Sequence, residues 1–212
     1  MNQATLFYIH DPMCSWCWGF NKTWQTLRQQ LEADNIAITY VMGGLAPDSD
    51  QPMPADMQKM LQNTWARIEK TIPGTQFNYD FWSKCQPRRS TYPACRAVIA
   101  AKQINIEYEA PMILEIQKAY YLHAQNPSNN DTLTACAQNL GLDPDEFSEL
   151  LGSTLVQQTL EQNIGIYHQL ARATGVSGFP SLVISNGETL QGVGLDYLNA
   201  NTMYEQIREF LA

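Results

Sequence analysis

The stretch YIHDPMCSWCWGF, residues 8–20, places Cys14 and Cys17 three positions apart directly after a short apolar run. The segment TLFYIH, residues 5–10, is short and rich in β-branched and aromatic side chains, so it predicts a buried strand. An Asp-Pro pair then interrupts the pattern. From about Cys14 onward, the segment CSWCWGFNKTWQTLRQQLEA carries apolar residues at helical spacing. We therefore expect the two cysteines where a strand turns into a helix.

Further strands are predicted on both sides of the long middle part of the chain. A strand at residues 36–44 completes a βαβ unit, whose crossover should be right-handed. Near the C-terminus the β pattern returns on either side of Asn186-Gly187, a dipeptide that predicts a tight hairpin turn with both residues at positive φ. The expected hairpin strands are residues 181–185 and 189–193, with helices at residues 153–174 and 195–210.

The middle of the chain shows helical signals only. It opens with the Pro- and Asp-rich segment LAPDSDQPMPAD and continues with several short amphipathic stretches. One of them begins with Asp143, Pro144 and Glu146, a helix start with a cap, a first-turn proline and an acid. We therefore predict an α/β protein in two parts. The predicted sheet domain comprises residues 1–45 and 153–212, and residues 46–152 form an inserted all-helical subdomain.

The charge balance restricts the possible partners. The chain has 13 basic and 21 acidic residues among 212, a net charge of −8, and a hydrophobic content of 44% typical of a soluble globular protein. Nucleic acid and anionic membranes are not expected as partners, because both are bound through clustered Lys and Arg. The first residues lack the basic and apolar regions of a signal peptide, and no window is apolar enough to span a membrane. We therefore expect a cytoplasmic protein.

The cysteine pair has three possible roles: a metal site, an inert packing pair, or a reactive dithiol. Zinc would need two more ligands, and the chain has neither a second C-x-x-C nor an H-x₃₋₅-H, so we expect no metal and no cofactor. At a helix start, unpaired backbone N–H groups and the helix dipole favour a thiolate. The spacing therefore predicts that Cys14 attacks a disulfide and that Cys17 resolves the mixed disulfide.

Three further cysteines, Cys85, Cys95 and Cys136, follow no such pattern. An odd number of cysteines in a chain without a secretion signal argues against a structural disulfide framework. We expect these three to be reduced and mostly buried, and we assign Cys95 no chemistry. A regulatory bridge between Cys85 and Cys95 stays open.

A second element that bears on the chemistry is GVSGFPSLVI, in which Phe179-Pro180 stands directly before a predicted strand. Proline cannot donate to a strand ladder, so at this position it marks an edge or a tight turn. Together with the dithiol, in this order, it resembles the DsbA-like branch of the thioredoxin superfamily, in particular the cytosolic FrnE-like predicted disulfide isomerases. The resemblance rests on DPMCSWCWGF, the helical insertion and GVSGFPSLVI.

This resemblance implies a thioredoxin-like fold with an inserted helical subdomain. It also implies that Cys14 is the nucleophile, Cys17 the resolving thiol and Pro180 a cis-proline that helps to bind substrate. Phe179 and Trp16 are expected beside them as substrate-binding residues, with Trp16 on a partly exposed rim. Thioredoxins also carry a buried acid beneath the dithiol, for which the sequence offers no candidate.

The residues between the cysteines, Ser15 and Trp16, lack the histidine of the strongly oxidising DsbA. Without a positive neighbour the reduced form is less stabilised, so we expect a reductase or isomerase rather than a strong oxidase. His10 could restore part of the effect, but we expect it to be packed or solvent-facing at the strand end. Trp18 is expected in the core. The expected partners are disulfide-containing proteins or peptides and a reductant such as glutathione or a thioredoxin-type system.

Two other functions fit the same architecture. Kappa-class glutathione transferases and 2-hydroxychromene-2-carboxylate isomerases share the insertion, but a serine typically replaces their first cysteine, whereas this chain has both Cys14 and Cys17. A chaperone-like peptide-binding protein would use an apolar groove around Trp16 without needing either thiol. Both alternatives are left open here.

Overall fold

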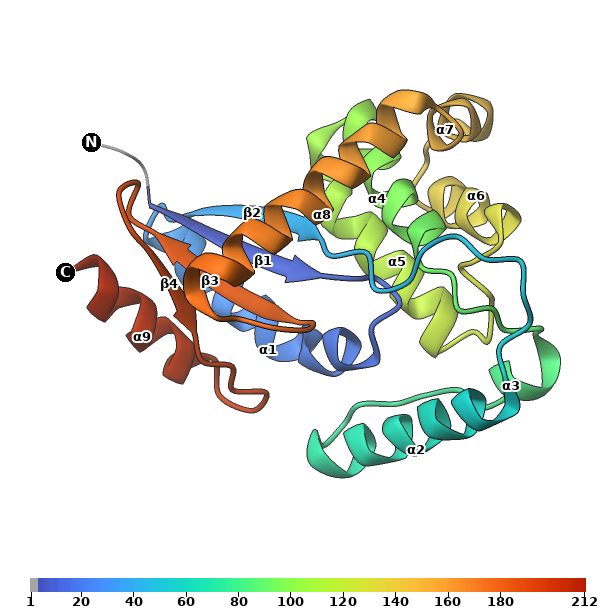
Figure 1. Ribbon diagram of the computed structural model, residues 1–212, viewed down its shortest axis with the longest axis horizontal. Coiled ribbons are helices and arrows are strands. Elements are labelled where there is room, and N and C mark those ends of the chain that lie inside the picture. Colours follow the sequence, from blue (N-terminus) through green and yellow to red (C-terminus); the bar gives the residue numbers. More distant parts are fainter. Residues whose placement is uncertain (1–3) are drawn as a thin grey trace.

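A four-stranded mixed sheet forms one half of the molecule, and the computed structural model describes residues 4–212 (Figure 1). Its strand order is β2-β1-β3-β4. Strand β1 (Thr5–His10) pairs in parallel with β2 (Ala37–Met42) through helix α1 (Ser15–Ala33), which confirms the predicted βαβ unit. Strand β3 (Ser181–Ser185) runs antiparallel to both β1 and β4 (Leu190–Val193). Strand β1 therefore lies between β2 and β3, and its C-terminal end leads to the two cysteines.

Helices cover both faces of this sheet. Because side chains alternate along a strand, Leu6 and Tyr8 face α1 and α9 (Ala200–Leu211), whereas Ile9 faces the opposite side. There the C-terminal half of α8 (Thr154–Thr174) packs through Leu170. This arrangement has the order of strands and helices predicted for a thioredoxin-like fold.

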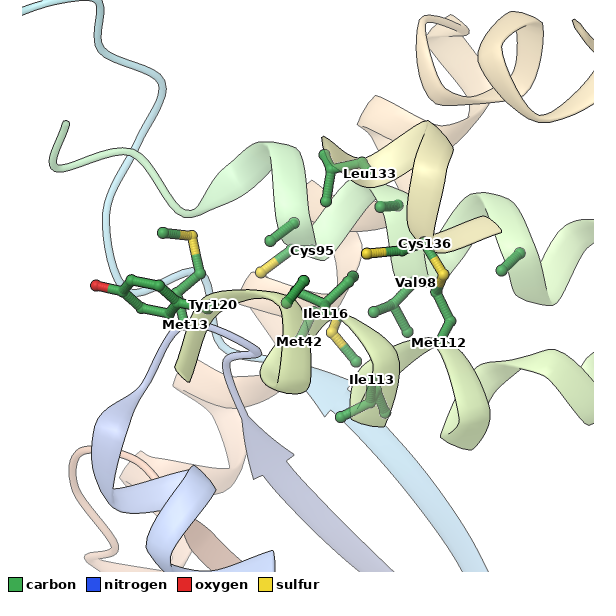
Figure 2. Packing of buried hydrophobic residues seen from close by; sticks show 14 of the residues in the cluster. Met13, Met42, Cys95, Val98, Met112, Ile113, Ile116, Tyr120, Leu133 and Cys136 are labelled. Carbon is green, nitrogen blue, oxygen red and sulfur yellow. The ribbon is translucent and has the colours of Figure 1, made fainter. Parts of the chain in front are cut away.

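Six α-helices lie between β2 and α8 in sequence, and their side chains form a second core (Figure 1). Figure 2 shows this core, in which Cys95 and Ile116 from neighbouring helices meet Met13 and Met42 from the sheet side. The region is helical as predicted, although the exact division at residues 45/46 and 152/153 stays a prediction. The helices are α2 (Ala55–Thr71), α3 (Phe81–Lys84), α4 (Tyr92–Ile104), α5 (Glu109–Tyr121), α6 (Asn130–Asn139) and α7 (Pro144–Leu151), with a short 3₁₀ turn at Ile106–Tyr108.

Helix α8 joins the two cores. It begins with a Ser153 cap, whose hydroxyl accepts a hydrogen bond from the Val156 N–H, and it ends at Gly175 with φ 77°. Its first half contributes Val156 to the helical core and its second half contributes Leu170 to the sheet. The predicted boundaries of this helix are confirmed.

Two local predictions were wrong, and one short helix was not predicted. The final helix begins at Ala200 rather than Leu195, because the Asp196 carboxylate accepts hydrogen bonds from two following backbone N–H groups and holds a turn there. The hairpin has no tight two-residue turn: only Gly187 has positive φ, and Asn186 instead caps a four-residue loop through its side chain. Helix α3 carried too few residues to be predicted.

Candidate functional site

The side chain of Cys14 caps helix α1. Its backbone is extended (φ −80°, ψ 117°), and its Sγ accepts a hydrogen bond from the Cys17 N–H at 3.4 Å. The Cys14 N–H in turn donates to the Asp11 carbonyl at 3.0 Å, so the turn after β1 fixes where the helix starts. A cysteine thus takes the place where a Ser, Thr or Asp side chain usually satisfies the first free N–H groups. This position is the one predicted from the C-x-x-C motif.

A second segment reaches the Cys14 sulfur from the far end of the sequence. The peptide bond between Phe179 and Pro180 is cis, and the Cys14 thiol lies 3.3 Å from the Phe179 carbonyl oxygen, to which it donates. Pro180 itself is buried just before β3, while Phe179 is half-buried and packs on Tyr167. The structure therefore brings Cys14, Cys17, Phe179 and Pro180 together.

The Cys17 thiol lies deeper than Cys14. It is completely buried, whereas Cys14 keeps 7% of its surface exposed. Burial raises the pKa of the Cys17 thiol, and its hydrogen bond with Cys14 raises it further. A cavity of about 360 Å³ between α1 and α5 reaches Cys17 and is also lined by Tyr8 and Gln117. The two sulfurs thus differ in their exposure to solvent.

His10 provides no positive charge to this site. It is completely buried, it stacks on Tyr8 with ring centroids 4.8 Å apart, and neither ring nitrogen has a hydrogen-bond partner among residues 4–212. Burial lowers the pKa of this imidazole from 6.5 to about 3, so it is neutral at physiological pH. The expectation of a packed histidine at the strand end is confirmed.

Asp11 is the buried acid that sequence reasoning missed. Its carboxylate is completely buried and accepts hydrogen bonds from the Met13 N–H, the Leu45 N–H and the Thr91 hydroxyl at 2.6–2.8 Å, with the Cys95 thiol 3.5 Å away. Burial raises its pKa, while these hydrogen bonds lower it. It also interacts electrostatically with Cys17. The sequence alone marks Asp11 only as the residue after a predicted strand, because Thr91 and Cys95, which cover it, lie 80 and 84 positions away.

Trp16 lies between the two cysteines and Trp18 directly follows them, and only the environment of Trp18 differs from the one expected. Trp16 is half-buried, as predicted for a rim, and its ring meets Tyr197 edge-on at 5.2 Å. Trp18 is not in the core: it is also half-buried, stacks on Tyr121 and donates from its indole N–H to the Gln76 carbonyl at 3.0 Å. An indole needs a partner for its N–H, which the loop after α2 offers at the surface.

The remaining cysteines are free thiols. Cys95 and Cys136 are buried, as expected, whereas Cys85 is half-buried and donates to the Ala124 carbonyl at 3.1 Å. Cys85 and Cys95 thus face different partners. Over residues 4–212 the structure contains no cluster of three or more His, Cys, Asp or Glu side chains suited to a metal ion. In the same part of the chain, every helix is too short or too polar to cross a bilayer.

Comparison with known proteins identifies the family. The chain matches the family described as Thioredoxin over residues 7–207. It is 24% identical to the ClpXP adapter protein SpxH of Halalkalibacterium halodurans, over 85% of this chain, and it spans only 58% of the length of that relative.

Solved structures agree with this assignment. The fold resembles that of a candidate protein disulfide isomerase of Nitrosomonas europaea, with TM-score 0.85, 26% identity, and coverage of 99% of this chain and 98% of the other. It also resembles the cytosolic disulfide reductase DsbM of Pseudomonas aeruginosa, with TM-score 0.76, 23% identity, and coverage of 98% and 100%. The chain therefore belongs to the thioredoxin family and has the DsbA-like fold of thiol–disulfide oxidoreductases.

Proposed function

We propose that the protein exchanges disulfides with protein or peptide substrates through Cys14 and Cys17, as a reductase or isomerase rather than a strong oxidase. The observation that carries this proposal is the position of the Cys14 sulfur. Cys14 is slightly exposed, whereas its partner Cys17 is completely buried. The Cys14 sulfur lies between the Cys17 N–H and the Phe179 carbonyl, which precedes cis-Pro180.

The proposed reaction has two exchange steps. The Cys14 thiolate attacks one sulfur of a substrate disulfide, which forms a mixed disulfide and releases the other substrate sulfur as a thiolate. Cys17 then loses its proton and attacks the Cys14 sulfur, which forms the Cys14–Cys17 disulfide and releases the second substrate thiolate. The substrate gains two electrons and two protons. An external dithiol, or two molecules of a monothiol, returns the protein to its reduced state.

Substrate binding is proposed at Phe179, Pro180 and Trp16. The Phe179 carbonyl lies at the Cys14 sulfur, so an extended peptide whose cysteine bonds to Cys14 would meet this backbone edge. Trp16 is half-buried beside it and offers an apolar face. Peptide backbone and apolar side chains on either side of a disulfide are the features that such an edge and ring would recognise.

The surroundings of Cys14 support a weakly oxidising couple. A strong oxidant needs a reduced form stabilised by positive charge at the nucleophilic sulfur. His10, at the end of β1, is neutral by burial, and the guanidinium of Arg67 lies over the Trp16 ring. The Phe179 carbonyl accepts a hydrogen bond from a thiol but repels a thiolate. The Cys17 N–H stabilises a thiolate at Cys14 and the Phe179 carbonyl destabilises it. These two effects together favour a reduction potential of about −180 to −270 mV, the range of disulfide isomerases and thioredoxin.

A reducing partner and a cytoplasmic location follow from such a potential. A couple at about −180 mV would be kept reduced by the cytosolic glutathione pool, at about −220 to −260 mV, whereas one at about −270 mV would need a thioredoxin-type donor. The cytosolic reductase DsbM, which shares the fold, has also been solved with GSH. We therefore propose glutathione or a thioredoxin-type system as the electron donor.

Reduction of insulin disulfides, with dithiothreitol as donor, tests this proposal. The wild-type protein should accelerate the reaction and Cys14→Ser should abolish the acceleration. Cys136→Ser is the matched control, because this thiol is buried within the helical core, away from α1. Loss of activity in the control, or full activity in Cys14→Ser, would contradict the proposal.

A further inference from the structure

Just under half of the Lys and Arg side chains in the described residues are paired with a carboxylate, but the arginine that lies over Trp16 is not. In the described part of the chain, six of the 13 Lys and Arg side chains lie within ion-pair distance of a carboxylate. Arg67 is not among these six. Its guanidinium carbon instead lies 5.1 Å from the centroid of the Trp16 ring, and Trp16 stands between the two cysteines.

Helix α2, which carries Arg67, is held firmly against the start of α1. The indole N–H of Trp65 donates to the Ser15 hydroxyl at 2.9 Å, and Ser15 is also one of the two residues between the cysteines. Trp65 and Ile68 are completely buried on either side of Arg67. These contacts fix the turn of α2 that carries Arg67 beside Ser15.

The close approach of the two helices depends on a glycine. A Cβ added at Gly19 of α1 would come within 2.9 Å of Ile68 and 2.8 Å of Ile72, so only a residue without a side chain lets α2 lie this close. The distance from Arg67 to the dithiol is therefore set by packing.

Two more cations extend the positive surface away from Trp16. Lys70 follows Arg67 by three residues and so lies on the same side of α2, and Lys22 borders a hollow of about 290 Å³ with Tyr197. Both are exposed. The acid nearest in sequence, Glu69, accepts hydrogen bonds from the Phe77 N–H and the Tyr79 hydroxyl. Arg67, Lys70 and Lys22 thus make a positively charged surface on a chain whose net charge is −8.

We infer that Arg67 is a specificity-determining residue that favours disulfides carrying a carboxylate close to the sulfur. This inference rests on the proposed thiol–disulfide exchange. A carboxylate beside a disulfide bound at Cys14 would lie over Trp16, where the guanidinium offers donors and forms no ion pair with a carboxylate of residues 4–212. Glutathione disulfide and peptides with Asp or Glu next to cysteine share this chemistry. Lys22 and Lys70 attract the same charge at longer range.

The test compares disulfides that differ only in charge. Second-order rate constants are measured for the reduced protein with glutathione disulfide, the uncharged bis(2-hydroxyethyl) disulfide and cationic cystamine. Arg67→Gln should lower the rate with glutathione disulfide by about 2- to 5-fold, the value of one exposed ion pair, and leave the uncharged compound unchanged. Arg67→Glu should lower it further and raise the rate with cystamine. Salt of about 1 M should remove the preference in wild type, because it screens charges beyond about 3 Å.

Lys59→Gln is the matched control. Lys59 is an exposed cation on the same helix, eight residues before Arg67 and hence about 12 Å away along its axis, beyond the Debye length of about 8 Å at physiological salt. It should keep the wild-type preference. Two disulfide-bonded peptides, one with Asp and one with Lys beside cysteine, show whether the carboxylate can come from a peptide as well as from glutathione. A faster reaction with the Asp peptide would assign the site to peptide substrates as well.

Equal loss with all three small disulfides in Arg67→Gln would show that Arg67 only positions Trp16, and would overturn the inference. An unchanged preference in Arg67→Gln would overturn it as well. Neither result touches the proposed function, which fails only if wild-type protein reduces none of the disulfides or if Cys14→Ser reduces them equally well.

Discussion

The buried, neutral state of His10 leads to a specific acid sensitivity of the fold. Burial lowers the pKa of this imidazole from 6.5 to about 3. His10 is therefore protonated below about pH 6.5 in the unfolded chain, but only below about pH 3 in the folded protein. The stability that His10 contributes is therefore complete above pH 6.5 and is lost as the pH falls. At pH 4.5, two units below the unfolded value, the loss is about 2.7 kcal/mol.

The perturbation is His10→Phe, which keeps an aromatic ring against Tyr8 but cannot take up a proton. Urea unfolding at pH 7.5 and pH 4.5 gives the free energy of unfolding of both proteins. The change with pH should be about 2.7 kcal/mol smaller in the variant, and the matching difference in melting temperature about 5–11 °C. Any constant packing cost of the larger ring cancels in this comparison.

His123→Gln is the control for the loss of one histidine, since His123 is exposed and lies outside the buried stack on Tyr8. An equal pH dependence in His10→Phe and wild type would refute the reasoning, because it would mean that the imidazole is protonated in the folded protein. The end of β1 would then carry a positive charge close in sequence to Cys14, which would argue against the proposed weakly oxidising couple.

Four other outcomes are expected. Gly43→Ala should lower insulin reduction sharply while the protein stays folded, because the new Cβ would overlap the Phe179 ring and displace the carbonyl at Cys14; Gly165→Ala, in open space on α8, should leave activity unchanged. The free energy of unfolding of Asp11→Asn, relative to wild type, should be more favourable at pH 7.5 than at pH 4, because the raised pKa of the Asp11 carboxyl in the folded protein makes wild type lose stability as the pH rises. Urea unfolding at both pH values measures this difference. A difference that does not change with pH would show that the carboxyl is not perturbed. Conjugation or isomerisation activity that survives Cys17→Ala would instead favour a glutathione transferase or chromene-carboxylate isomerase, and we expect none. Suppression of aggregation that is equal in wild type and Cys14→Ser, without insulin reduction, would favour a chaperone; we expect reduction that depends on Cys14.

The parts of the site that are local in sequence could be predicted. Cys14 and Cys17 lie at a strand-to-helix turn that periodicity indicates, and Phe179-Pro180 stands directly before a recognisable strand. Their approach to one another, across 165 positions, came from the family resemblance, because no pattern within one sequence reports a distant contact.

The features that were missed depend on such distant contacts. Asp11 is a buried acid only because Thr91 and Cys95, 80 and 84 positions away, fold over it. The contact between Arg67 and Trp16 likewise joins two helices that the sequence does not relate. The wrong hairpin turn has a different cause: the Asn186 side chain bonds to the backbone two and three residues ahead, which competes with the tight turn that the dipeptide usually forms.

Redox titration in glutathione buffers, with the bridged cysteines identified by mass spectrometry, tests the central claim most directly. We predict one two-electron couple that joins Cys14 to Cys17, with a midpoint between about −180 and −270 mV. A midpoint near about −120 mV, the value of the strong oxidant DsbA, would contradict the account of the sulfur's surroundings. Failure of these two residues to form a disulfide in any buffer would contradict the proposed chemistry itself.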